Sequence, residues 1–173
     1  MRKIGLLGGS FNPAHQGHIH ISLMAKKKLG LDQIWWLPTV QNPLKNKTCY
    51  RSFENRVDYC QSLLQKNLVN SRLIKIFTVK YKYSLELVKF LKLRNRNCDF
   101  YWIMGADNVS NLHLWKNYYN FIKSVKIVIF ARNSDLTLIK KTRSWKLLNI
   151  VGAKIFFTQK LNISSTFIRD NNV

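Results

Sequence analysis

Two glycines and two histidines near the start of the chain have the types and spacing of a phosphate-binding turn. Gly8 and Gly9 end an apolar segment, and His15 and His18 follow, three residues apart. Glycines let the backbone approach a ligand closely, and the first turn of a helix offers N–H groups and the positive end of the helix dipole to an anion. Side chains at this spacing share one face of the turn, where they would supply hydrogen bonds and, when protonated, charge. The pattern predicts a nucleotide site.

Better-known nucleotide and metal motifs do not fit this turn. It lacks GxGxxG and the GK[ST] ending of a P-loop, and HxxH with no third cysteine, histidine or acidic residue nearby is a poor zinc site. The alternative that stays open is a tight strand-to-helix turn with solvated histidines.

A second candidate anion site lies near the other end of the chain. Ser164, Ser165 and Thr166 follow the apolar segment 155–157 and stand where a helix is expected to begin. Ser164 could cap that helix, and the hydroxyls, the free N–H groups and Arg169 one turn later could bind phosphate. The alternative is an ordinary serine cap with a solvated arginine.

Together, segments 8–18 (GGSFNPAHQGH) and 163–169 (ISSTFIR) resemble the two signature motifs of the HxGH nucleotidyltransferase superfamily. The intermediate segments are similar to those of bacterial nicotinate-nucleotide adenylyltransferases: 41–45 (QNPLK), 83–87 (YSLEL), 104–108 (MGADN) with Trp115, and 130–132 (FAR). The resemblance implies adenylyl transfer from ATP to nicotinate mononucleotide, giving nicotinate adenine dinucleotide and pyrophosphate in NAD biosynthesis. Phosphopantetheine adenylyltransferase shares the end motifs and remains an alternative activity.

The resemblance also implies roles for single residues. His15, His18 and Arg169 would be catalytic. The ATP site would comprise Gly8, Gly9, Ser10, Phe11, His15, His18, Gly105, Asp107, Ser164, Ser165, Thr166 and Arg169. The mononucleotide site would comprise Asn12, Lys45, Tyr83, Ser84, Trp115, Lys116 and Arg132, with Trp115 as the platform for the pyridine ring.

Other roles stay open for several of these residues. Trp115 could be a core residue, Asp107 a helix cap, and Lys45 and Arg132 solvated charges. Asn12 stands where many superfamily members have aspartate, so any direct charge contribution there is absent. Because no cluster of carboxylates is evident, we expect Mg²⁺ to accompany ATP, with no dedicated metal site in the protein.

Length and composition are typical of one enzyme domain. A chain of 173 residues with 46% hydrophobic content can bury a sizeable core, so we expect a single nucleotidyltransferase domain over residues 1–173. The sequence contains no run of about eighteen apolar residues, so we expect no membrane-spanning helix. Three widely spaced cysteines fit reduced thiols and a cytoplasmic location. The oligomeric state, a homo-oligomer included, stays open.

The high positive charge raises a second class of function. The formal net charge is +21, which is typical of nucleic-acid-binding proteins. The basic residues are dispersed and no recognised nucleic-acid motif is present, so we expect no specific nucleic-acid partner. A positive field would also attract ATP and a mononucleotide.

Alternation of apolar and amphipathic segments predicts an α/β fold, a Rossmann-like doubly wound domain with a mainly parallel central sheet. We expect the strand order 3-2-1-4-5, with ligands at the carboxyl ends of strands one and four. The expected helices are 17–29, 54–65, 84–93 and 108–121. The expected strands are 3–7, 33–37, 73–78, 100–104, 125–130 and 154–157.

Overall fold

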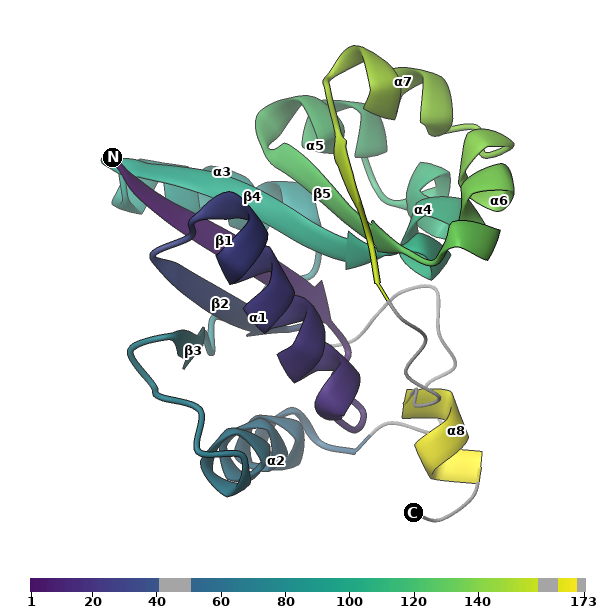
Figure 1. Cartoon of the computed structure of the whole chain (residues 1–173). Coiled ribbons are helices and arrows are strands. Elements are labelled where there is room, and N and C mark those ends of the chain that lie inside the picture. Colours follow the sequence, from purple (N-terminus) through teal and green to yellow (C-terminus); the bar gives the residue numbers. More distant parts are fainter. Residues whose placement is uncertain (41–50, 159–164, 171–173) are drawn as a thin grey trace. The chain divides into compact units, whose positions relative to one another are not determined.

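The computed structural model describes residues 1–40, 51–158 and 165–170, and its contacts divide the chain into two compact units (Figure 1). The amino-terminal unit consists of Ile4–Lys82 with Leu161–Val173, and the central unit of Tyr83–Lys160 with Met1–Lys3. Each unit has its own parallel strands and its own buried core. The single domain expected over 1–173 stays a prediction. In the part of the chain described, no helix is long and apolar enough to cross a membrane.

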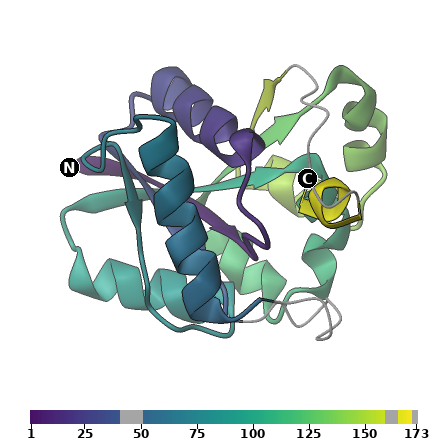
Figure 2. The ribbon, with the colours of Figure 1, turned by 90° about the horizontal axis from the view of Figure 1, so that it is seen from below.

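The amino-terminal unit is built on three parallel strands in the order β3-β2-β1. Leu6 of β1 pairs with Trp35 of β2, and Trp35 pairs with Lys75 of β3. Helices α1 and α2 contact these strands (Figures 1 and 2), and a short helix, α8, comes from the carboxyl end of the chain. The elements are β1 (Arg2–Gly9), α1 (Gln16–Leu29), β2 (Gln33–Pro38), α2 (Phe53–Lys66), β3 (Ile74–Ile76) and α8 (Ser165–Asp170).

Side chains and caps explain where these helices begin and end. Helix α1 ends at Gly30, whose φ of 60° is left-handed and suits glycine, after three lysines in the last turn that complement the helix dipole. Helix α2 begins after Ser52, whose Oγ accepts a hydrogen bond from the N–H of Asn55.

The central unit also has three parallel strands, in the order β4-β5-β6. Trp102 of β4 pairs with Ile127 of β5, and Ile129 pairs with Ile155 of β6. The elements are α3 (Ser84–Arg94), β4 (Cys98–Gly105), α4 (Ala106–Asn111), the 3₁₀ turn η2 (Leu112–Leu114), α5 (Tyr118–Ser124), β5 (Lys126–Ala131), the 3₁₀ turn η3 (Asn133–Asp135), α6 (Leu136–Lys140), α7 (Trp145–Ile150) and β6 (Lys154–Phe157).

The α/β class with parallel strands is confirmed, and the orders 3-2-1 and 4-5 are confirmed within the units. The continuous helix expected over 108–121 is wrong. The chain there forms α4, η2 and α5, because Trp115 is extended and Asn117 has a left-handed φ of 54°, which cannot continue a helix. The short helices α6 and α7 were not expected from the sequence.

Candidate active site

His15 and His18 form a reciprocal cap at the start of α1. The Nδ1 atom of His15 accepts a hydrogen bond from the N–H of Gly17 at 3.1 Å, and the Nδ1 atom of His18 accepts one from the N–H of His15, also at 3.1 Å. The two ring centroids are 4.0 Å apart. The expected position, on or just before the first helical turn, is confirmed: His15 is the cap and His18 the third residue of the helix.

These hydrogen bonds decide how the imidazoles can act. A nitrogen that accepts a hydrogen bond carries no hydrogen, so each ring in its neutral form carries its hydrogen on Nε2 and donates from there. Burial lowers the pKa of His15 from 6.5 to about 4. His15 is therefore neutral at pH 7 and acts as a hydrogen-bonding group without a positive charge.

Buried aromatic side chains pack against the ring of His18. Phe11 lies 4.7 Å from His18 and 5.1 Å from Trp36, measured between ring centroids. The indole N–H of Trp36 donates to the hydroxyl of Ser22 at 2.9 Å, and that hydroxyl donates to the carbonyl of His18 at 2.8 Å. The first turn of α1 is thus joined to strand β2 through two hydrogen bonds, of which the one from Trp36 is buried.

The residues that follow β1, Phe11 and Asn12, are buried and make contacts within the protein. Phe11 was expected in the ATP site, but its ring is 1% exposed and stacks in the core. Asn12 is 3% exposed, and its Oδ1 accepts a hydrogen bond from the N–H of Arg51. A Cβ on Gly9 would lie 3.5 Å from the ring of Phe11, an ordinary contact. Packing among the residues that the structure describes therefore does not require glycine at position 9, and the role expected for Gly9 in the ATP site stays a prediction.

The carboxyl-terminal motif meets the histidine turn within the amino-terminal unit. Ser165 Oγ donates to the carbonyl of Pro13 at 2.8 Å, and Arg169 Nη1 donates to the carbonyl of Asn12 at 2.5 Å. These partners are 152 and 157 residues apart in the sequence. Ser164 lies outside the described residues, as does the side chain of Thr166. The two motifs singled out at opposite ends of the sequence are thus joined in space.

Arg56 is a residue of this region that the sequence analysis did not single out. Its side chain is 1% exposed, and it donates to four main-chain carbonyls. Two of the four belong to Ser10, after β1, and Thr39, after β2. The other acceptors are Arg51 at 3.1 Å and Val40 at 2.8 Å. The guanidinium fixes the segments that leave the carboxyl ends of both strands. The sequence held one indication that Arg56 is buried. It lies three residues after Phe53 and four before Cys60, and residues at these spacings lie on the same face of a helix.

In the central unit, β4 ends at Gly105, beside the carboxylate of Asp107. A Cβ on Gly105 would lie 2.6 Å from the Oδ1 atom of Asp107, so a larger residue here would displace that exposed carboxylate. Gly105 is itself the cap residue of α4, and Asp107 is exposed in the first turn. The cap role considered for Asp107 is therefore wrong, and its carboxylate is accessible to a ribose hydroxyl.

Four residues assigned to the mononucleotide lie in this unit, and two of them, Tyr83 and Lys116, are in contact. The Nζ atom of Lys116 lies 4.3 Å from the centroid of the Tyr83 ring. Ser84 is the first residue of α3, where main-chain N–H groups lack partners within the helix. The half-buried ring of Trp115 contacts Trp102 and Phe121, with centroids 6.2 and 5.4 Å away. Trp115 is thus neither a helix residue nor a fully buried core residue.

Arg132 is held by a carboxylate and is not a freely solvated charge. Its Nε and Nη2 atoms donate to both oxygens of Asp135 at 2.9–3.1 Å. The pair lowers the pKa of Asp135, first through the side-chain hydrogen bond from Arg132. The hydrogen bond to Asp135 and the charge of that carboxylate raise the pKa of Arg132, and the charge of Asp107 adds a smaller contribution in the same direction. Lys45, the other cation expected to bind the mononucleotide phosphate, lies outside the described residues.

The described residues that could ligate a metal ion are few and scattered. Across residues 1–40, 51–158 and 165–170, no three His, Cys, Asp or Glu side chains gather as metal ligands would. The two histidines present N–H groups on Nε2, and a nitrogen that carries a hydrogen cannot ligate a metal.

Comparison with known proteins identifies the family. A family model described as cytidylyltransferase-like matches residues 6–171. A probable nicotinate-nucleotide adenylyltransferase of Pelagibacter ubique (strain HTCC1062) is 35% identical over 169 residues, which cover 96% of this chain and 92% of the relative. The chain belongs to the nicotinate-nucleotide adenylyltransferases within this cytidylyltransferase-like family. Another relative with that name, from Agrobacterium fabrum (strain C58 / ATCC 33970), is 35% identical and covers 80% of this chain and 74% of its own length.

Solved structures agree on the fold of this adenylyltransferase family member. The nicotinic acid mononucleotide adenylyltransferase of Plasmodium falciparum, in complex with NaAD, matches with a TM-score of 0.75 at 19% identity. The match covers 98% of this chain and 83% of the other. The resemblance drawn from the two end motifs and the fold class are confirmed.

Proposed function

We propose that this protein transfers the adenylyl group of ATP to nicotinate mononucleotide, giving nicotinate adenine dinucleotide and pyrophosphate. The observation that carries the proposal is the meeting of the two end motifs. Ser165 and Arg169 hydrogen-bond to the loop Asn12–Pro13, which leads directly into the histidine cap of α1. A nucleotide site assembled from both ends of the chain fits the family to which the chain belongs.

The reaction itself needs positioning more than acid–base chemistry. A phosphate oxygen of the mononucleotide, already ionised, forms a bond to the α-phosphorus of ATP, and the bond to the β-phosphate oxygen breaks in line. Pyrophosphate leaves with the electron pair, and no proton has to be removed from the nucleophile. Such reactions are accelerated by orientation and by donors aimed at the oxygens that gain charge.

The ATP phosphates are assigned to the amino-terminal unit. The Nε2–H groups of His15 and His18, with the first main-chain N–H groups of α1, would donate to these phosphates as negative charge moves toward the leaving group. A phosphate beside His15 would favour the protonated imidazole, but protonation of Nδ1 would break its hydrogen bond from the N–H of Gly17, so His15 is proposed to act as a neutral donor. Arg169 would bind the β- and γ-phosphates through guanidinium donors beyond its contact with Asn12, and Ser165 would do so through its main-chain N–H, because its hydroxyl hydrogen is already donated to Pro13.

The mononucleotide is assigned chiefly to the central unit. The half-buried ring of Trp115 would stack on the pyridine ring, and the N–H groups at Ser84 and Lys116 would bind its carboxylate. The carboxylate of Asp107 would accept hydrogen bonds from a ribose. Arg132 is the weaker candidate for a phosphate ligand because Asp135 already occupies its Nε and Nη2 donors.

Mg²⁺ would enter bound to the phosphates of ATP and would supply charge neutralisation there. None of the residues discussed above is proposed as its ligand. A cytoplasmic location follows from this substrate pair and is proposed with the function.

Pyrophosphate release tests the proposal. Purified protein with ATP and magnesium should release pyrophosphate with nicotinate mononucleotide, and much less with nicotinamide mononucleotide or phosphopantetheine. If pyrophosphate is released with phosphopantetheine and with neither mononucleotide, the protein is a phosphopantetheine adenylyltransferase instead. Absence of release with all three acceptors would overturn the assignment to adenylyl transfer.

A further inference from the structure

A pocket in the central unit lies away from the residues assigned to substrates. It has a volume of about 510 Å³ and is formed by the end of α3, the start of β4, the end of α5 and the start of β5. Its apolar lining consists mainly of Phe100, Ile122 and Val125, which are buried. Small-molecule sites have volumes of about 300–1,000 Å³, so the pocket is large enough for a ligand.

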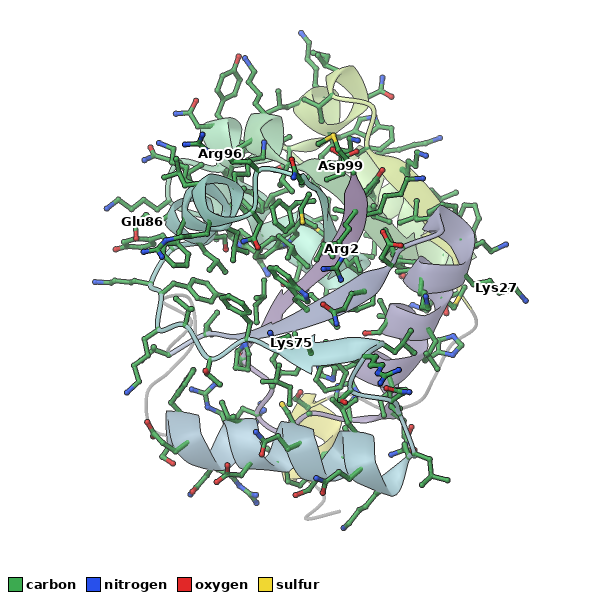
Figure 3. The ribbon with its side chains drawn as sticks, turned by 90° about the vertical axis from the view of Figure 1, so that its left-hand side faces the viewer. Arg2, Lys27, Lys75, Glu86, Arg96 and Asp99 are labelled. Carbon is green, nitrogen blue, oxygen red and sulfur yellow. The ribbon has the colours of Figure 1, made fainter. Side chains whose placement is uncertain are left out.

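Positive charge concentrates at the rim of this pocket. Lys92, Arg96, Lys123 and Lys126 line it, against a single acidic residue, Asp99. Figure 3 labels Arg96, which lies between α3 and β4, and Asp99, the second residue of β4. The four basic side chains and one acidic side chain leave an excess of three positive charges around one cavity.

Two of these cations are already engaged. Lys126 Nζ lies 2.8 Å from Asp99 Oδ2, and Lys123 Nζ donates to the hydroxyl of Tyr119 at 2.7 Å. Lys92 and Arg96 are both exposed and form no ion pair with any residue that the structure describes. They are the side chains with charge available to an anion.

Stabilisation of helix ends explains only part of this cluster. Lys92 is in the last turn of α3 and Lys123 in that of α5, where a cation complements the helix dipole. Arg96 lies beyond the end of α3, and Lys126 is the first residue of β5. Because both lie outside the helices, a dipole argument does not account for their convergence on the pocket.

The pocket is separate from the residues that would bind substrate in the same unit. It adjoins Cys98 and Asp99 at the start of β4, whereas Gly105 and Asp107 lie at and beyond its carboxyl end. The eight residues of β4 span roughly 23 Å at about 3.3 Å per residue.

We propose that this pocket is a second anion site, which binds a small molecule carrying two or more phosphate groups. Multiple phosphates match an excess of several positive charges, and a concave pocket with an apolar lining suits a compact ligand. A nucleic acid strand is the less favoured source of phosphate. Phe100 is the only aromatic ring among the lining residues described, and it is 3% exposed, so it offers no surface for base stacking.

Two-dimensional ¹⁵N–¹H NMR with inorganic tripolyphosphate tests the site directly. Saturable shifts are expected in the amide signals of segments 95–100 and 122–126, with affinity that falls as salt is raised. The double variant Lys92→Gln/Arg96→Gln should bind at this pocket at least about tenfold more weakly, because two charge-assisted contacts are lost. The matched control is Lys89→Gln/Arg94→Gln, which removes the same charges from exposed positions of α3 that do not line the pocket, and it should bind as the parent does.

Three results would overturn the proposal: no saturable shift in these segments, equal weakening in both double variants, or saturation by an RNA oligonucleotide but not by tripolyphosphate. Signals near His15 and His18 report on the substrate site in the same spectra. Failure of the second site would therefore leave the proposed function intact, and the reverse also holds.

Discussion

Replacing Arg56 tests whether one buried guanidinium holds the segments that surround the ATP phosphates. Arg56→Met keeps much of the side-chain volume but removes the charge and every donor. Four main-chain carbonyls, those of Ser10, Thr39, Val40 and Arg51, would lose their hydrogen bonds from a group that is 1% exposed. We expect both stability and ATP binding to suffer.

The magnitude follows from the burial. A hydrogen bond to a charged group contributes about 1.5–3 kcal/mol, but bonds that share one side chain are not additive. Breaking a buried charged network costs roughly 3–5 kcal/mol in the free energy of unfolding. At about 2–4 °C per kcal/mol for a chain of this size, the melting temperature should fall by roughly 6–20 °C. Such a loss is a large share of the total stability of a typical domain, about 5–15 kcal/mol.

Two further variants test whether the effect comes from the hydrogen bonds of the Arg56 guanidinium or from removing any arginine. Arg56→Lys keeps the charge and some donors but cannot reach carbonyls in several directions at once, so its melting temperature should lie between those of the parent and Arg56→Met. Arg72→Met, at an exposed position of the same unit, should change the free energy of unfolding by less than about 0.5 kcal/mol.

Thermal unfolding followed by circular dichroism gives the comparison, and calorimetric titration with ATP at a temperature where all variants are folded gives the binding term. The reasoning is refuted if Arg56→Met melts within about 2 °C of Arg72→Met. Loss of stability with unchanged ATP affinity would show that Arg56 supports the fold without positioning the phosphate segments.

Three other predictions concern the site directly. His18→Ala should leave the fold intact and lower turnover at least about a hundredfold, because one preorganised donor is removed. His20→Ala, which lies in α1 outside the histidine motif, is the control and should have a mild effect in the same pyrophosphate assay. Arg169→Ala should weaken ATP and pyrophosphate binding roughly ten- to a hundredfold and spare nicotinate mononucleotide, whereas Trp115→Ala should do the opposite; equal weakening of both ligands in calorimetry would contradict the assignment. Burial lowers the pKa of His15 from its ordinary value of 6.5 to about 4, so the unfolded chain takes up a proton at a higher pH than the folded protein does. The free energy of unfolding should therefore decrease as the pH falls from 6.5 to 4. In urea titrations, His15→Gln should reduce this dependence on pH.

The sequence predicts those elements whose residues follow one simple period. Strand 154–157 was expected with the bounds that β6 has, and the helix expected over 84–93 ends one residue early. These segments carry uninterrupted apolar spacing, which a buried face imposes directly on the sequence. The segment 108–121 has helix-compatible spacing too, yet Asn117 adopts a left-handed conformation there. Spacing alone cannot reveal a left-handed residue, since asparagine occurs in both conformations.

The roles of site residues were harder to predict than their location. Phe11 lies within the glycine-rich motif, but its ring fills the core against Trp36, a contact with a strand that begins more than twenty residues later in the chain. Arg132 has an accepting carboxylate three residues away, and only the fold of η3 turns Asp135 back to meet it. In both cases a short motif identifies the residue as a candidate for the site, but contacts with other parts of the fold determine which groups its side chain can bind.

Hydrogen bonds within the protein orient the side chains that are proposed to bind the nucleotide. Each Nδ1 atom of the two histidines is occupied by a main-chain N–H, which leaves Nε2 as the donor and fixes the orientation of both rings. Ser165 and Arg169 donate to the carbonyls of Pro13 and Asn12, so the carboxyl-terminal helix is attached to the loop before any phosphate binds. Because the geometry is set in advance, binding energy need not be spent on ordering these donors, and it remains available to stabilise the charge that develops on the leaving pyrophosphate.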